Sequence, residues 1–470
     1  MIGNEKLNKI ALAGVILFLY LTFIFGRSFI GLYVFGFRLG ELIIGFLLIF
    51  TLITFFIDTS FFGDDYQIIK IKKVLNVLLF LFLLTSILTN SNLFNLYTYK
   101  VSSYVWVIPC IYIGYYFSES FLENKIIAII FSTSLPIVYI LSTVKFPDLL
   151  ITFFEQNSDK FDFVKASDLL MVYVFVNMLL RLCFSNKLIS FGYLIISSAV
   201  MFPMFLFKSK GSFVGFIVFL IFEIFHYKDL IKKNILKTFL LLLTTPLFFI
   251  VSSFEISGDS LLNGLFVEQP TSENVEKLIE PEIINSPSEP SLENSNTIEA
   301  EVISETLLDN FDNKIAGNGL EDNRKLVEIV DGRIYTSDNT LNWRLQIWQD
   351  VVYDLIDKGQ IIYGYGYTEI IPAMDTIARS GVDNKNENVH NFLFNIIARG
   401  GLLHFLVISS LFILFYLSSN KKNILLFTIP LLIVSFFDSS MESVRFPTIF
   451  YFVVGSFLNH NNSRKSDIIE

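Results

Sequence analysis

The chain has 470 residues, of which 53% are hydrophobic, 16% aromatic and 17% charged, and its mean hydropathy is +0.59. A water-soluble domain of this size does not normally reach such values, so the composition argues against a soluble enzyme. The acidic formal charge of −9 makes nucleic acid an unexpected partner. Cys110 and Cys183 fall in or beside apolar segments, so neither a disulfide framework nor a cysteine metal site is expected.

Long apolar segments with charged boundaries recur along the chain. A membrane-spanning helix needs about 20 mostly apolar residues, and about twelve segments meet this requirement. The first follows Lys6 and Lys9, and we interpret it as an uncleaved helix because no small-residue cleavage site follows it. The sequence predicts an all-α polytopic membrane protein with one large extracytoplasmic loop that contains short amphipathic helices. The predicted spans are 10–26, 39–57, 74–90, 103–118, 125–143, 166–183, 188–207, 211–227, 236–253, 391–418, 423–438 and 446–459.

The distribution of lysine and arginine predicts the orientation. With the N-terminus in the cytoplasm, most basic residues of the short loops lie inside, as the positive-inside rule requires. Both termini are then cytoplasmic. The predicted domains are N-terminal transmembrane helices over 1–253, a large outer loop over 254–390 and C-terminal transmembrane helices over 391–470. The basic residues in or beside the short outer loops are Arg27, Arg38, Lys100, Lys145, Lys160, Lys165, Lys208, Lys210 and Arg445.

The large outer loop has two parts of different composition. Residues 265–310 hold ten Glu and one Asp against one Lys, with four prolines among many Ser and Asn. Such a stretch cannot bury enough apolar surface to fold alone, so we interpret it as a disordered insertion or tether. Residues 341–390 form the part expected to lie near the substrate. There, Leu341, Leu345, Trp348, Val352 and Leu355 recur at helical spacing and predict an amphipathic helix.

Two basic features on the outer side could bind an anion. Lys208 and Lys210 flank a hairpin between two apolar segments, where ammonium groups could bind a diphosphate and Gly211 could let helix N–H groups approach it. The alternative is that both lysines snorkel to the interface. Arg344 precedes Trp348 by one helical turn and could bind phosphate in a bidentate manner. Its alternative is an exposed arginine stacked on an aromatic ring.

His390 is the histidine that the topology places at the outer membrane boundary. A neutral imidazole there could accept a proton from a sugar hydroxyl, although a lone interfacial histidine is more often structural. His404 lies further along the same helix and is expected to be packed. The chain shows neither an acidic pair with Mg²⁺-ligand spacing nor a His/Cys cluster, so no metal is expected.

Four short motifs follow one another in a fixed order, and each is weak by itself. Together they resemble the bacterial O-antigen ligase and polymerase family over about residues 200 to 450. The helix count and the single large outer loop agree with this resemblance. The motifs are Arg344-Leu345-Gln346-Ile347-Trp348, Gly364-Tyr365-Gly366-Tyr367, His390-Asn391-Phe392-Leu393 and Arg399-Gly400-Gly401-Leu402.

The resemblance implies a GT-C-type glycosyltransferase of the bacterial inner membrane. Such an enzyme takes a glycan from an undecaprenyl-diphosphate carrier and transfers it to a growing polysaccharide or a lipid A core, with membrane lipid and a chain-length regulator protein as further candidate partners and no cofactor. The family histidine maps to His390 as the base and a family arginine to Arg344 as a diphosphate ligand. Lys208 and Lys210 stand where many relatives have an arginine. Further candidate site residues are Asn391, Arg399 and Glu442, with Asp438 in a loosely aligned acidic position; Arg399 faces either the carrier phosphate or Glu442.

The predicted function is therefore metal-independent, inverting polymerisation of a surface polysaccharide. A ligase that transfers the glycan to lipid A core shares all of the motifs and remains open. A polytopic transporter or lipid-linked glycan flippase would also explain the hydrophobicity, but we see no paired repeats or interrupted helices in the sequence. A third alternative is an envelope sensor or scaffold that uses the acidic segment 265–310.

Overall fold

The structure is a computed structural model that describes residues 2–56, 66–257, 327–376, 379, 387–418 and 420–466. The predicted disordered segment 265–310 and the loop Ser380–Asp383 lie outside these residues. The chain divides into two compact units, which are described separately. The membrane unit comprises 1–261, 355–369 and 390–470, and the loop unit comprises 262–354 and 370–389. Residues 355–369, predicted as part of the outer loop, thus belong to the membrane unit.

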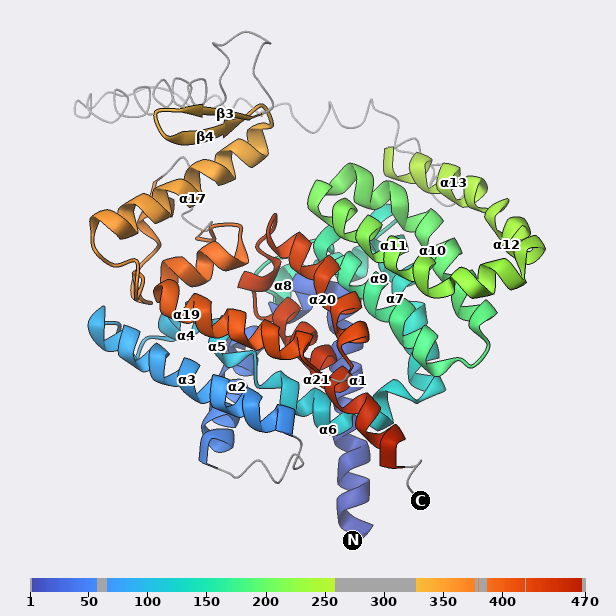
Figure 1. The fold of residues 1–470 in the computed structure, drawn as a ribbon, viewed down its shortest axis with the longest axis horizontal. Coiled ribbons are helices and arrows are strands. Elements are labelled where there is room, and N and C mark those ends of the chain that lie inside the picture. Colours follow the sequence, from blue (N-terminus) through green and yellow to red (C-terminus); the bar gives the residue numbers. More distant parts are fainter. Residues whose placement is uncertain are drawn as a thin grey trace, which may run out of the picture. The chain divides into compact units, whose positions relative to one another are not determined.

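Helices make up almost all of the membrane unit (Figure 1). Apolar runs of helical length, bounded by polar or glycine-containing turns, account for most of them. The helix pairs with the most extensive contacts are α6 with α21, α10 with α13, α11 with α20, α7 with α9 and α3 with α19. The helices are α1 (Ile2–Ile30), α2 (Leu39–Phe56), α3 (Tyr66–Leu88), α4 (Leu96–Val101), α5 (Ser103–Trp106), α6 (Cys110–Leu122), α7 (Lys125–Thr143), α8 (Asp148–Asn157), α9 (Ala166–Cys183), α10 (Lys187–Lys208), α11 (Lys210–Lys233), α12 (Ile235–Leu242), α13 (Thr245–Ser257), α19 (Phe392–Tyr416), α20 (Lys421–Ser435), the 3-10 helix η3 (Ser440–Glu442) and α21 (Arg445–Ser466).

Within the described residues, nine helical segments are long and apolar enough to cross a membrane. Each overlaps a predicted span. The other three predicted spans lie in α11, α20 and α21, which are helical as well. The prediction of a helical, polytopic membrane protein is thus confirmed in this coarse form, and the number of twelve spans stays a prediction.

Helix α9 forms the centre of the membrane unit, and its apolar window is 94% buried. Ion pairs fasten both of its ends. Near its start, Asp168 pairs with Arg445 of α21; near its end, Arg181 pairs with Glu223 of α11 at 2.6 Å and donates to Asn423 of α20. A buried charge is tolerated only when it is paired, so these contacts fix how α9 packs between its neighbours.

Helices α6 and α21 pack so closely that glycines are required. A Cβ atom on Gly114 would overlap the carbonyl of Phe452, and one on Gly455 would overlap the carbonyl of Ile111. The Ser118 hydroxyl donates to the facing backbone of α21 at 2.6 Å. Small residues and serine hydroxyls at a helix interface are typical of packing within membranes.

A small antiparallel hairpin between α1 and α2 was not predicted. Its strands are β1 (Tyr33–Val34) and β2 (Phe37–Arg38). Ion pairs hold this hairpin region to the segment before α9: Arg38 lies 3.3 Å from Asp159, and Arg27 lies 3.5 Å from Asp162.

The described part of the loop unit contains a second hairpin that was also not predicted. Its strands are β3 (Val327–Val330) and β4 (Arg333–Thr336). Helix α17 (Asn339–Asp357), of which residues 355–357 are counted with the membrane unit, and the 3-10 helix η2 (Pro372–Met374) follow. The prediction of a helix here is confirmed. Its polar side binds the hairpin: Gln349 accepts the N–H of Ile334 at 2.7 Å, and Asp350 accepts from Arg333 at 2.7 Å.

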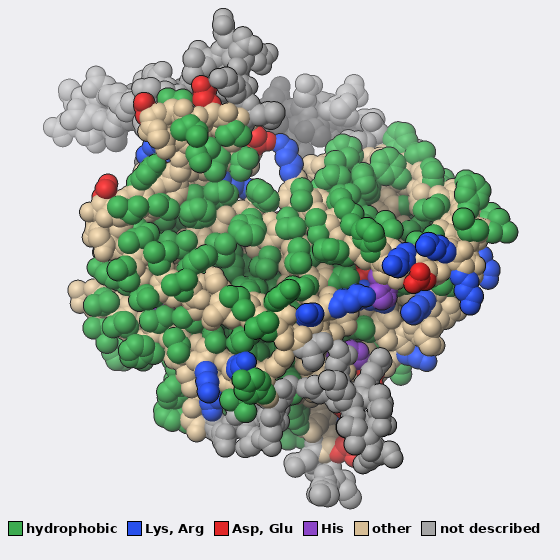
Figure 2. Space-filling model, viewed as in Figure 1, with side chains coloured by type: hydrophobic (Ala, Val, Ile, Leu, Met, Phe, Trp, Pro, Cys, Tyr) green, Lys and Arg blue, Asp and Glu red, His purple; other side chains and the backbone are tan. Residues whose placement is uncertain are grey.

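Hydrophobic side chains cover much of the face shown in Figure 2, and Lys and Arg side chains gather on its lower part. Exposed lysines stand at helix ends, including Lys187, Lys233 and Lys421. An apolar surface of this extent suits a hydrocarbon surrounding and not water.

Candidate functional site

Asn391 begins α19 and ties it to the turn after α20. Its side-chain oxygen accepts the backbone N–H groups of Leu393 at 2.9 Å and Phe394 at 3.2 Å, which is the arrangement of an N-cap. Its side-chain nitrogen donates to the carbonyl of Phe436 at 3.1 Å, and the residue is 2% exposed. Asn391 therefore has a structural role that occupies most of its hydrogen-bonding groups.

The basic hairpin reaches the same turn. Lys208 ends α10, and Ser209 caps α11 by accepting the N–H of Ser212 at 3.2 Å. A Cβ atom on Gly211 would come within 2.9 Å of the Cβ atom of Phe437. Gly211 thus allows the start of α11 to pack directly on this turn.

Phe436 and Phe437 consequently join segments that are far apart in the sequence. The turn continues through Asp438, whose carboxylate accepts the N–H of Ser439 at 2.7 Å, to the half-buried Glu442 in η3. We use the name cap cluster for the segments Lys208–Gly211, His390–Asn391 and Phe436–Glu442. It brings basic, acidic and imidazole-bearing segments to one end of the membrane unit.

His390 has a left-handed backbone conformation, with φ of 55°. This region costs a residue other than glycine about 1–3 kcal/mol, although histidine enters it more readily than most. The side chain is half-buried. Because the next residue is the buried cap of α19, the backbone of His390 is held in a defined position.

Five of the basic residues in the loops predicted to lie outside form ion pairs with a carboxylate. Lys208 differs: its described contact is a hydrogen bond of 3.5 Å to the carbonyl of Ser142, and its side chain is exposed. Lys210 is exposed at the start of α11. Lys208 therefore has the capacity to bind an external anion. The carboxylate-paired cations are Arg27, Arg38, Lys145, Lys160 and Arg445.

Arg344 lies in the loop unit, half-buried on α17 and one turn before Trp348. The indole N–H of Trp348 donates to the carbonyl of Val389 at 2.8 Å. Both residues belong to the loop unit, so this bond holds α17 to the segment that ends at Val389.

Arg399 is 2% exposed and binds the loop that carries the Gly-x-Gly motif. It donates to the carbonyls of Gly366 and Glu369 and to the hydroxyl of Tyr97. Its guanidinium carbon also lies 5.9 Å from the centroid of the Tyr97 ring. The structure thus joins two motifs that the sequence shows only as consecutive, and it places Arg399 between them.

A buried hydrogen-bonded group lies beside this contact and was missed from the sequence. The imidazole of His404 bonds the hydroxyl of Tyr104 at 2.9 Å, and Tyr104 bonds the hydroxyl of Tyr367 at 3.0 Å. Burial raises the pKa of Tyr367 well above its usual value, so this phenol stays protonated. The hydrogen-bonded partners are 300 and 263 residues apart, so no local sequence pattern could predict this group. The sequence predicted only that His404 is a packed side chain.

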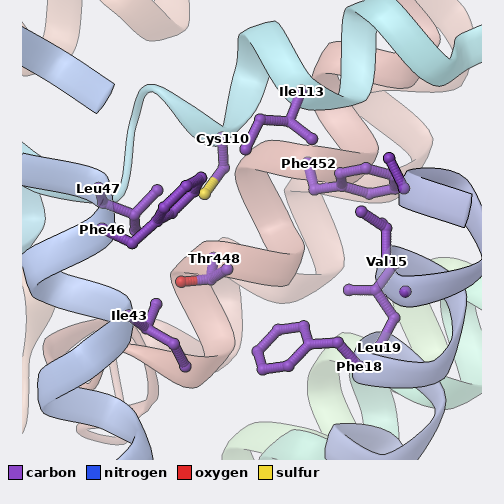
Figure 3. A pocket seen from close by; sticks show the side chains of 12 residues that line it. Val15, Phe18, Leu19, Ile43, Phe46, Leu47, Cys110, Ile113, Thr448 and Phe452 are labelled. Carbon is purple, nitrogen blue, oxygen red and sulfur yellow. The ribbon is translucent and has the colours of Figure 1, made fainter. Parts of the chain in front are cut away.

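Two cavities in the described part of the membrane unit are lined mostly by apolar side chains. One of about 340 Å³ lies between α1, α2, α6 and α21, with Phe18, Phe46, Cys110 and Thr448 around it (Figure 3). Another of about 450 Å³ lies between α10, α11 and the α12–α13 segment. Neither of these two cavities is lined by a charged side chain or a histidine.

Within the described residues, no group of three His, Cys, Asp or Glu side chains is arranged to hold a metal ion. Cys110 and Cys183 are both buried thiols. Comparisons of the chain with protein-family models, with curated proteins and with solved structures give no match.

Proposed function

We propose that this chain is a membrane glycosyltransferase that polymerises a surface polysaccharide in a bacterial inner membrane. The donor is a glycan on undecaprenyl diphosphate, the acceptor is a sugar hydroxyl, and the reaction takes place on the extracytoplasmic side with inversion at the anomeric carbon. The proposal rests on the residues that resemble the O-antigen ligase and polymerase family.

The meeting of the three segments of the cap cluster is the observation that carries the proposal. A glycosyl transfer from a lipid diphosphate needs a base for the acceptor and cations for the leaving group in one place. His390 lies next to Asn391, which bonds Phe436, and the hairpin of Lys208 and Lys210 packs on Phe437 through Gly211. Residues chosen separately from the sequence thus belong to one local structure.

In the proposed step, the acceptor oxygen attacks the anomeric carbon of the donor sugar. The bond from this carbon to the diphosphate oxygen breaks, and its electron pair leaves with the lipid diphosphate. His390 accepts the proton of the acceptor hydroxyl, and Lys208, Lys210 and Arg344 stabilise the charge that develops on the diphosphate. The hydrogen bonds of Arg399 and Asn391 within the protein favour structural roles for these two residues.

His390→Ala tests the proposal. General-base catalysis contributes roughly 10²- to 10⁴-fold, so we expect this variant to lower transfer by at least about 100-fold in a deletion strain complemented with the gene. Surface glycans and undecaprenyl-diphosphate intermediates are resolved by gel and mass spectrometry. His226→Ala is the matched control, because it removes a half-buried histidine near the other end of α11; it should retain transfer within about threefold.

The pattern of products separates the alternatives. Single repeat units on the surface without long chains support a polymerase, and long chains retained on undecaprenyl diphosphate support a ligase. If wild type and deletion strain show the same pools of both, the glycosyltransferase proposal is wrong and a transporter or flippase becomes the better explanation. Full transfer by a well-expressed His390→Ala protein would reject His390 as the base.

A further inference from the structure

Helix α19 is broken in its middle. Gly401 has φ of 68° and ψ of −169°, which only glycine adopts readily. The next two backbone N–H groups bond to another segment: Leu402 donates to the carbonyl of Ile361 at 3.0 Å, and Leu403 donates to that of Ile362 at 3.2 Å. A Cβ atom on Gly401 would overlap the carbonyl of Ile362.

In a continuous helix these two N–H groups would bond the carbonyls four residues earlier, on Ala398 and Arg399. Those carbonyls accept instead from Tyr365 at 2.7 Å and from Gly366 at 3.0 Å. These four backbone groups of α19 therefore bond to residues 361–366. Irregular backbone at membrane depth is stable only when protein satisfies it in this way.

Arg399 fastens this loop from the first half of α19. Its guanidinium bonds the carbonyls of Gly366 and Glu369 and the hydroxyl of Tyr97. From the second half, His404 holds the same loop through Tyr104 and Tyr367. One basic side chain from each side of the break thus keeps the loop in place.

The first half of α19, residues 392–400, leads from the break to the cap cluster. Asn391 and Arg399 are eight residues apart, or about 12 Å along a helix at 1.5 Å per residue. A helix of this length moves as a rigid body. If its direction changes at the break, the other end moves too, and with it His390, the residue before the cap.

We propose that Arg399 is a positioning residue: by fastening loop 361–369 into the break of α19, it sets the direction of the half-helix that holds His390. The consequence for catalysis rests on the proposed function, whereas the fastening of the half-helix does not. The experiment therefore has one arm that needs no activity and one that measures transfer.

The first arm measures the exposure of the half-helix. Ile396, which is fully buried, is replaced by cysteine in a protein whose Cys110 and Cys183 are alanine. A water-soluble maleimide then reports how often water reaches this position. Arg399→Lys keeps the charge but lacks the planar fork that serves several acceptors, and we expect labelling to become at least about tenfold faster. Arg38→Lys, which changes an exposed, ion-paired arginine, should leave the rate within about twofold.

The second arm measures transfer by Arg399→Lys. A misplacement of about 1 Å can cost about 100-fold in rate, so kcat should fall about 100-fold while the KM for the lipid-linked donor stays within about threefold. If Arg399 instead bound the diphosphate, the donor KM would rise with labelling unchanged, and the proposal would be rejected. Unchanged kcat with faster labelling would also reject the positioning role.

A second variant and the activity of the wild-type protein complete the test. Tyr97→Phe removes one acceptor of Arg399 and keeps the ring; it should give a smaller increase in labelling and serves as the test if Arg399→Lys fails to fold. If the wild-type protein transfers no glycan, the proposed function fails, while the labelling arm still decides whether Arg399 holds the half-helix.

Discussion

The charges of single residues divide the outer-loop cations into two groups. Arg27, Arg38 and Arg445 have carboxylate partners, so no ligand is needed to explain basic residues in loops that are predicted to lie outside. Lys208 has a backbone carbonyl at 3.5 Å as its described partner. Basic residues that a membrane protein keeps without a local counter-ion are candidates for binding an external anion.

Lys208→Gln should weaken donor binding. A hydrogen bond to a charged group is worth about 1.5–3 kcal/mol, and partial exposure reduces this value, so we expect the donor KM to rise about tenfold while kcat changes less. Transfer is measured at several donor concentrations in membranes from the complemented strain. Lys145→Gln, which removes an exposed cation that pairs with Asp148 at 3.8 Å, is the control and should leave the KM unchanged. An equal KM in both variants would show that Lys208 only snorkels.

At this scale the sequence predicted residue types better than their partners. The position and chemistry of His390, Lys208 and Lys210 in the sequence suggested site roles, and these roles stay predictions; what the structure adds is that their segments pack on Phe436 and Phe437. The role of Phe437 could not be predicted, because it depends on the close approach of two segments more than two hundred residues apart. Charged residues within apolar runs, such as Asp168, do signal a partner, but the sequence does not say which one.

At the scale of elements, the distance between packed helices determines which glycines tolerate a side chain. Gly114→Ala would place a Cβ atom into the carbonyl of Phe452 and should destabilise the protein by about 1–3 kcal/mol, the usual cost of overpacking. Gly192→Ala in α10 meets nothing within 4 Å and should be neutral or gain up to about 1 kcal/mol from helix propensity. Thermal unfolding in detergent, followed by loss of monodisperse protein, distinguishes the two. Equal melting temperatures would contradict the close packing.

Apolar length was enough to locate most helices, because burial in lipid requires long apolar segments. It was not enough to detect the break in α19, since residues 392–416 read as one continuous apolar helix. The prediction that no helix is interrupted, which was used against a transporter, is therefore wrong. The two small hairpins were missed because strands of two and four residues carry too short a pattern. The predicted apolar face of α17 was partly right: Trp348 and Leu355 are buried, whereas Val352 is half-buried.

At the scale of the whole molecule, helix α1 begins and α21 ends toward the same side of the membrane unit (Figure 1). An even number of crossings would have this result, whereas the side that is cytoplasmic stays a prediction. The ion pair of Arg181 with Glu223 and the bond to Asn423 also place the end of α9 beside the start of α20.

The orientation itself leads to a prediction for fusion proteins. A green fluorescent protein inserted at Asn186, between α9 and α10, should fluoresce because the rule places this turn in the cytoplasm. An alkaline phosphatase fused after Lys145, between α7 and α8, should be active because it folds only outside. The reciprocal fusions serve as controls. Activity of phosphatase at Asn186 with fluorescence at Lys145 would invert the orientation and remove the cap cluster from the side where the donor glycan is available.

The break in α19 also has a consequence for how the protein is made. During insertion, residues 392–416 enter the bilayer as one apolar segment, and in lipid a continuous helix is the form that satisfies its backbone. The bonds of Ala398, Arg399, Leu402 and Leu403 to loop 361–366 can form only once that loop lies beside the helix. We therefore expect a straight α19 as an assembly intermediate, whose conversion to the broken form is the step at which the membrane unit becomes complete.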